Sequence, residues 1–144
     1  MTLTVLQLTE HEHDDFVRDH KHGHLMQTVA WGKVKEPTGW RWRTVAVGRH
    51  TPDGTQVTGA ALLLFRRTPI LPLALCYCPR GFVVDWSDAE SVDLLLQELV
   101  TLLQIPEHRE LVRDVREGLE ERLLVAVDGL ELLCVRGAIL RGDA

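Results

Sequence analysis

The sequence predicts a mixed α/β domain with a mostly antiparallel central sheet flanked by helices, and three observations predict it. Residues 40–47 alternate between two faces, as the residues of a β-strand do. The turn Pro52-Asp53-Gly54 joins them to an apolar segment, which indicates an antiparallel hairpin. Residues 89–104 instead carry a broad apolar stripe at helical spacing.

The N-terminal elements follow from local signals. We expect a short strand over residues 3–8 and a helix over residues 10–20, with Thr9 as its cap. The polar segment 21–24 interrupts the chain. Apolar residues then recur at near-helical spacing over residues 25–35, which predicts a short second helix.

The rest of the chain alternates between strands and helices. Residues 57–65 and 73–78 are predicted strands, and Ser87 with Glu90 predicts a capping box for the helix 89–104. Residues 106–122 have the pattern of a charged helix. Residues 123–135 are typical of a hairpin around a tight turn.

Composition is that of an ordinary globular domain. The chain has 144 residues, of which 45% are hydrophobic and 26% charged. It contains no apolar run of the roughly 20 residues that a membrane-spanning helix needs, and residues 1–10 lack a secretory signal pattern. Its three cysteines do not form a disulfide framework. We therefore expect a cytoplasmic protein.

Charge is distributed unevenly along the chain. The net charge of -5 argues against a DNA-binding protein. Eight basic and two acidic residues nevertheless fall between Lys33 and Arg80. This basic middle suits a small anionic substrate such as a diphosphate. The alternative is a solvated sheet surface whose arginines pair with acidic helices.

Two groups of metal-ligating residue types stand out, and we predict no metal site from either. Five histidines fall between His11 and His24, but they are not paired with cysteines at zinc-finger spacing, so exposed polar loop histidines are expected. Cys76 and Cys78 point to one face of a strand, where buried cysteines usually behave as small hydrophobic residues.

Residues 56–61 match the Q-x-x-G-x-A pattern with which acetyltransferases bind the pyrophosphate of coenzyme A. That pattern requires a helix N-terminus facing the phosphates. Here the glycine opens an apolar strand and no helix follows. The match is therefore interpreted as accidental, and no cofactor is predicted.

Two segments are candidate anion-binding sites. Trp31 and Lys35 are four residues apart, so on a helix they share one face, and the ammonium beside the indole is a plausible phosphate anchor. Alternatively, Trp31 packs inward and Lys35 extends over it into water. Tyr77 leads into a turn in which Pro79 and Gly81 bracket Arg80. That guanidinium can bind a phosphate or carboxylate, or it can pair with Asp85 to fasten the turn.

These segments, in this order, resemble the FemABX family of peptidoglycan bridge-forming aminoacyl transferases. The resemblance covers about residues 16–104. Its matching positions are His24, Leu25, Met26, Gln27, Trp31, Lys35, Gly39, Trp40, residues 57–65, Tyr77, Pro79, Arg80, Gly81 and Asp85.

The resemblance implies a GNAT-like (acetyltransferase-like) fold and a function. Family members contain two such subdomains and transfer amino acids from aminoacyl-tRNA to the peptide of a UDP-linked or lipid-linked muropeptide. The family lysine that grips the acceptor diphosphate maps onto Lys35, and Trp31, Tyr77 and Arg80 are the other candidate substrate-binding residues. The mechanism needs no covalent intermediate, and we assign no catalytic residue.

The chain departs from the family in two places. Phe82 stands where a proline is usual, and we expect the second subdomain to be absent. We therefore divide the chain into a family-like subdomain, residues 1–104, and a non-aligning tail, residues 105–144, which either is frameshifted or completes the same domain. Three hypotheses follow: a truncated transferase, a muropeptide-binding module or half-enzyme completed by a partner chain or by self-association, and a stand-alone acetyltransferase.

Overall fold

The computed structural model describes residues 2–67, 74–104, 122–127, 130–135 and 138–141, and confirms the predicted fold class. Its strands form one sheet in the order β1-β2-β3-β4-β6-β7-β8, with β5 paired to β3. The strands are β1 (Thr4–Leu6), β2 (Arg41–Thr51), β3 (Gly54–Arg67), β4 (Ala74–Cys78), β5 (Val83–Val84), β6 (Arg122–Val127), β7 (Leu130–Val135) and β8 (Ala138–Arg141). The helices are α1 (Glu10–Asp19), α2 (Val29–Lys35) and α3 (Ala89–Gln104), with short 3₁₀ turns η1 (Leu25–Gln27) and η2 (Glu36–Thr38).

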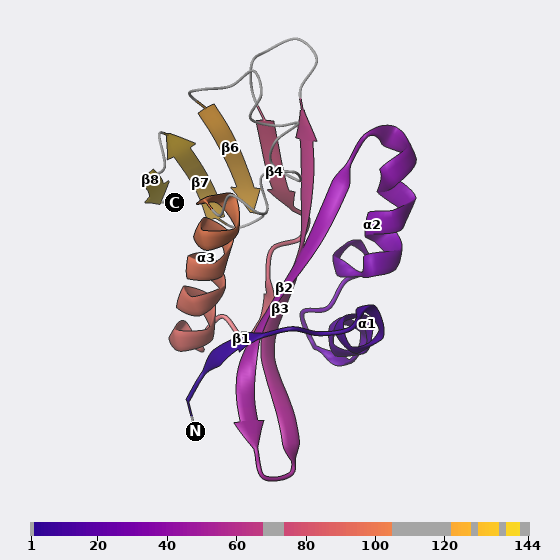
Figure 1. Ribbon diagram of the computed structural model, residues 1–144, viewed down its shortest axis with the longest axis vertical. Helices are drawn as coiled ribbons and strands as arrows, with labels where there is room; N and C mark the ends of the chain where they lie inside the picture. Colours follow the sequence, from indigo (N-terminus) through magenta and orange to yellow (C-terminus); the bar gives the residue numbers. More distant parts are fainter. Residues whose placement is uncertain (1, 68–73, 105–121, 128–129, 136–137, 142–144) are drawn as a thin grey trace.

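The hairpin of β2 and β3 is the longest feature of the sheet (Figure 1). Thr51 pairs with Gly54 across the predicted turn, which leaves two residues between the strands, and Gly54 has a φ of 132°, which favours glycine. Val47 pairs with Gly59 and the next residue, Gly48, pairs with Val57, so Thr58 is an extra residue that forms a bulge in β3. Both strands extend beyond the predicted segments.

β4 pairs with β3 in the antiparallel sense and with β6 in the parallel sense. β6 and β7 form the predicted antiparallel hairpin, in which Val127 pairs with Leu130. The predicted charged helix over residues 106–122 lies almost wholly outside the described residues. Its last residue, Arg122, begins β6.

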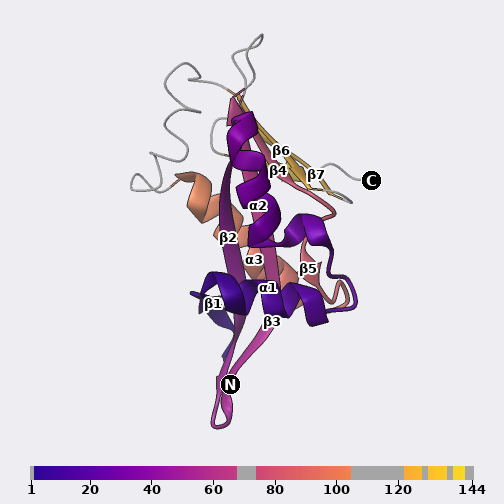
Figure 2. The same ribbon diagram turned by 90° about the vertical axis from the view of Figure 1, so that its right-hand side faces the viewer.

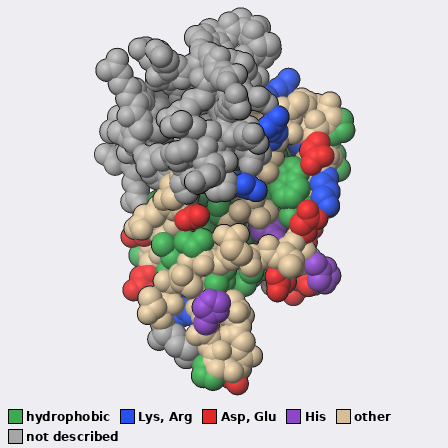
Figure 3. Space-filling view, viewed as in Figure 1, with side chains coloured by type: hydrophobic (Ala, Val, Ile, Leu, Met, Phe, Trp, Pro, Cys, Tyr) green, Lys and Arg blue, Asp and Glu red, His purple; other side chains and the backbone are tan. Residues whose placement is uncertain are grey.

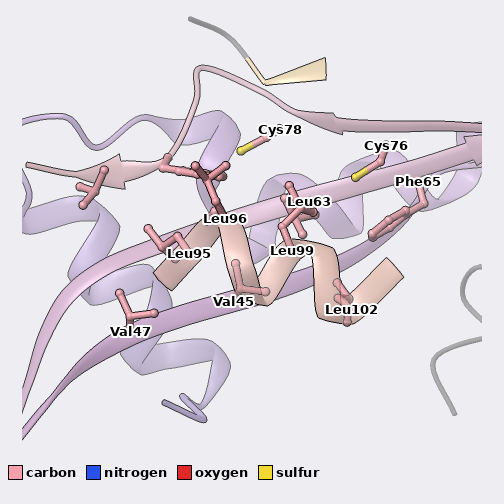
Figure 4. Close-up of a cluster of buried hydrophobic side chains, with 13 residues drawn as sticks. Val45, Val47, Leu63, Phe65, Cys76, Cys78, Leu95, Leu96, Leu99 and Leu102 are labelled. Atoms are coloured by element: carbon pink, nitrogen blue, oxygen red, sulfur yellow. The ribbon is translucent and has the colours of Figure 1, made fainter. Parts of the chain in front are cut away.

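Helices cover both faces of the sheet. Figure 2 shows α1 and α2 in front of the β2–β3 ribbon and α3 behind it. The main core lies under α3 and is built from apolar side chains of β2, β3, β4 and α3 together with Phe82 and Val84 (Figure 4). A smaller cluster around Leu6, Ala46 and Ala60 packs against Phe16 of α1. Among the described residues, no helix is long and apolar enough to cross a membrane.

Helix caps confirm one sequence prediction and correct two. Thr9 caps α1 in a capping box: its Oγ1 accepts the Glu12 N–H at 3.2 Å, and the Glu12 carboxylate accepts the Thr9 N–H at 2.8 Å. The predicted helix 25–35 is instead divided at Thr28, which ends η1 and caps α2.

The capping box predicted from Ser87 and Glu90 is wrong. Asp88 occupies the cap of α3, because its carboxylate accepts the N–H of Ser91 at 3.3 Å and its hydroxyl at 2.6 Å. The Ser87 hydroxyl turns back to Asp85 instead. Glu90 pairs with Arg49. Ser87 therefore fastens the loop that precedes the helix.

Candidate functional site

Helix α2 carries the first pair of candidate residues, and its start is fixed by side chains. The Thr28 hydroxyl accepts the Trp31 N–H at 3.1 Å, and the Asp14 carboxylate of α1 accepts the Val29 N–H at 2.7 Å. Both acceptors satisfy N–H groups that lack partners within a helix. The position of α2 therefore depends on α1 as well as on its own cap.

Trp31 and Lys35 meet as predicted: the Lys35 Nζ lies 5.0 Å from the centroid of the indole. This is a cation–π contact. Both side chains are half-buried. Lys33 points elsewhere and donates to Glu10 at 2.6 Å, and this hydrogen bond raises the pKa of the Lys33 ammonium. Two lysines on one short helix therefore have different surroundings.

Gly32 lets α2 lie close against the sheet. A Cβ at this position would lie 2.7 Å from Cγ of Trp42, a distance shorter than the contacts that Cβ atoms make in proteins. The Trp42 indole N–H donates to Glu36 at 2.7 Å, so the ring is held at its far edge as well. The Trp31–Lys35 pair is thereby held over the face of the sheet on which Trp42 lies.

Tyr77 lies on that same face. It is paired with Leu64 of β3, and Leu64 is paired with Trp42 of β2. Residues directly opposite each other in a sheet project from one face. Cys76 and Cys78, its neighbours along β4, point the other way and are fully buried in the main core. Burial raises the pKa of the Cys76 thiol well above its usual value, in keeping with its role as a small hydrophobic residue.

Arg80 is exposed on a tight turn directly after β4. The Gly81 N–H donates to the Cys78 carbonyl at 3.2 Å and closes the turn. Arg80 has a φ of 66° and is the one non-glycine residue with positive φ in the described part of the chain. Such a conformation persists only where the surroundings enforce it, and it is frequent at ligand-binding sites.

Gln27 is the residue whose role sequence reasoning missed. It was noted only as one match to the family pattern, yet it is fully buried. Its Oε1 accepts the Leu62 N–H at 2.7 Å, and its Nε2 contacts the Leu62 carbonyl at 3.3 Å and also the Pro79 carbonyl. Its own carbonyl accepts from His13 Nε2 at 2.8 Å. No composition or spacing signal marks it.

The histidine prediction is wrong for His13, which is fully buried on α1. Burial lowers the pKa of its imidazole, and its Nδ1 has no hydrogen-bond partner in the described part of the chain. The spacing of four residues between His13 and the buried Val17 was the signal for an inward position. Among the described residues, no group of three or more metal-ligating side chains is arranged to hold a metal.

The Q-x-x-G-x-A match lies inside β3. Gln56, Gly59 and Ala61 all pair with residues of β2, so no helix N-terminus opens there. This agrees with the interpretation of the match as accidental.

Charged side chains surround α2. Figure 3 shows Lys and Arg along the side of the molecule that α2 occupies, interleaved with Asp and Glu. Some cations of the basic middle pair with carboxylates of the helices, as the alternative explanation of this region expects. Arg49 of β2, for example, lies 3.2 Å from Glu90 of α3.

The sheet and its helices define a mixed α/β domain of GNAT-like fold, with Trp31, Lys35 and Tyr77 assigned to one face and Arg80 on the turn beside it. The chain belongs to the FemAB family, whose model matches residues 8–112 and so includes all four residues.

Characterised relatives agree with this assignment. The chain is 48% identical over 91 residues to the Lipid II:glycine glycyltransferase of Staphylococcus aureus, a match that covers 63% of this chain and 21% of that protein. The protein of strain USA300 gives the same values. The crystal structure of FemX matches with a TM-score of 0.64 and 36% identity, over 85% of this chain and 26% of that one. The chain thus spans about a fifth of the length of these curated relatives.

Proposed function

We propose that this chain is the N-terminal part of a peptidoglycan bridge aminoacyl transferase and contributes to binding of its acceptor. Its ligand is a muropeptide precursor, UDP-linked or lipid-linked, to whose peptide an amino acid is transferred from aminoacyl-tRNA. The observation that carries the proposal is the 48% identity to a Lipid II:glycine glycyltransferase, in a chain whose family match includes the whole candidate site.

The surroundings of Lys35 support a role in binding the diphosphate. Its ammonium is held over the Trp31 indole, and it belongs to the helix that Gly32 seats against the sheet. An ammonium over the face of an indole still has N–H groups that can donate to an anion. Lys33, in contrast, already donates to Glu10.

The role of Arg80 follows from its backbone. An arginine at positive φ is strained by roughly 1–3 kcal/mol, and such strain accompanies ligand-binding turns. Its planar guanidinium suits two-pronged contact with phosphate or carboxylate oxygens. Tyr77, on the face of the sheet beside the turn, would contact the same ligand.

Calorimetric titration of the 144-residue chain with a UDP-linked muramyl pentapeptide tests the proposal. We expect binding that Lys35→Ala weakens about tenfold or more, since a hydrogen bond to a charged group contributes roughly 1.5–3 kcal/mol. Lys33→Ala is the matched control on the same helix and should bind like the wild type. Equal losses in both variants, or no binding by the wild type, would contradict the proposal.

Two further measurements separate the remaining hypotheses. Transfer of an amino acid from charged tRNA by this chain alone would show a self-sufficient transferase. Binding without transfer favours a module completed by a partner chain or a second copy. Binding of coenzyme A in place of the muropeptide would instead favour the stand-alone acetyltransferase.

A further inference from the structure

The edge of β3 that faces β4 and β5 contains a gap. β3 pairs with β5 at Gly59 and Ala60, and with β4 from Leu64 onward. Between these pairings the chain leaves the sheet after Cys78 to form the turn that holds Arg80. The backbone of Leu62 lies opposite this excursion and has no strand partner on that side among the described residues.

Gln27, from the 3₁₀ turn η1, fills this gap with its side chain. Its side-chain amide bonds both the N–H and the C=O of Leu62, as a peptide group of a neighbouring strand would. The same amide nitrogen donates to the Pro79 carbonyl. One buried side chain thus joins the central strand to the residue that immediately precedes Arg80.

The backbone of Gln27 is fixed as well. His13 of α1 binds its carbonyl at 2.8 Å, and its N–H donates to the His24 carbonyl at 2.9 Å. The next residue, Thr28, caps the helix that carries Trp31. Gln27 therefore lies where α1, the start of α2, β3 and the turn after β4 meet.

We propose that Gln27 is a positioning residue that holds the Pro79–Gly81 turn so that Arg80 can bind the acceptor. This inference rests on the proposed function. A buried amide without partners is costly, so the Pro79 carbonyl and the Leu62 peptide group lock the Gln27 side chain, and the locked side chain in turn fixes Pro79. The strained φ of Arg80 needs such support.

Two substitutions test the role of the amide. Gln27→Met has a similar volume but no hydrogen-bonding groups. Gln27→Glu keeps the acceptor for Leu62 N–H and, when protonated, an O–H donor for the Pro79 carbonyl. Burial raises a carboxyl pKa, which favours that neutral form. We expect Gln27→Met to weaken binding of the UDP-linked muramyl pentapeptide about as much as Arg80→Ala. Gln27→Glu should restore binding increasingly as the pH is lowered.

A double-mutant cycle distinguishes positioning from general loss of structure. If Gln27 acts through Arg80, the loss caused by Gln27→Met disappears in an Arg80→Ala background. The same loss should persist in a Lys35→Ala background. Full, independent losses in both backgrounds would overturn the inference.

A ligand-free measurement separates this inference from the proposed function. The Gly81 amide, bonded to the Cys78 carbonyl, reports on the turn. Gln27→Met should accelerate its hydrogen exchange more than that of the Val47 amide in the core, and Gln27→Glu at low pH should restore protection. Unchanged Gly81 exchange in Gln27→Met overturns the inference. Failure of the wild type to bind the precursor counts against the proposed function, and the exchange result still decides the role of Gln27.

Discussion

His13 makes the stability of the chain depend on pH near neutrality. Its imidazole is fully buried, its Nε2 bonds the Gln27 carbonyl, and its Nδ1 has no hydrogen-bond partner among the residues that the structure describes. Because a carbonyl only accepts, Nε2 carries the proton and Nδ1 is bare. Protonating Nδ1 would place an unpaired charge in the interior, which is why burial lowers the pKa of His13 below its usual value of 6.5.

The sign of the effect follows from proton binding. Between the lowered pKa of the folded state and the usual pKa of about 6.5, the unfolded chain binds more protons, so stability falls as the pH falls. The stability contributed by neutral His13 is fully present above about pH 6.5. A single titrating group changes the free energy of unfolding by at most about 1.4 kcal/mol per pH unit. Below the pKa of His13 in the folded state, the loss of stability stops growing.

Urea unfolding of the wild type and of His13→Gln between pH 7.5 and 5.5 measures this slope. Glutamine can still donate to the Gln27 carbonyl but does not titrate, so its curve should be flatter. The pKa of His20 is also lowered by burial, but His20 is present in both proteins and does not affect their difference. Parallel curves for the two proteins would refute the reasoning.

Local packing and capping yield three further predictions. Thr9→Ala should lower the free energy of unfolding by about 1 kcal/mol because it removes the α1 cap, while Glu12→Gln, which keeps an acceptor in the capping box, should cost less. Asp88→Ala should cost about as much as Thr9→Ala, and urea midpoints compare all three. Gly48→Ala should destabilise by at least about 1–3 kcal/mol, because its Cβ would lie 2.1 Å from the Gln56 carbonyl oxygen. An unchanged midpoint for Gly48→Ala would show that the bulge relaxes without cost.

Local signals predicted the elements of the fold well. The sequence Pro52-Asp53-Gly54 favours a tight hairpin turn because Pro, Asp and Gly each favour a backbone conformation that such turns use. In the structure, this turn has two residues between the paired strands. Thr9 was recognised as a cap from its neighbours in sequence alone. Ser87 was not the cap it seemed, since Asp85 competes for its hydroxyl and Asp88 stands one residue nearer the helix.

The candidate site was predictable only in part. The contact of Trp31 with Lys35 follows from a spacing of four on a helix. The gap that Gln27 fills arises from the register of three strands, and no local pattern encodes that register. His13 is buried for the same kind of reason: the partner of its Nε2 is a carbonyl fourteen residues away, on another element.

The parallel pairing of β4 with β6 has a consequence for the order of folding. β2 and β3 are joined by two residues, so their pairing closes a short loop. Ala74 pairs with Leu123, and that contact closes a loop of nearly fifty residues. Long-range pairing is slow because the chain loses loop-closure entropy before the new contacts can stabilise it. We expect the β2–β3 hairpin to be ordered in the folding transition state, and the β6–β8 edge to join a sheet whose other strands are already in place.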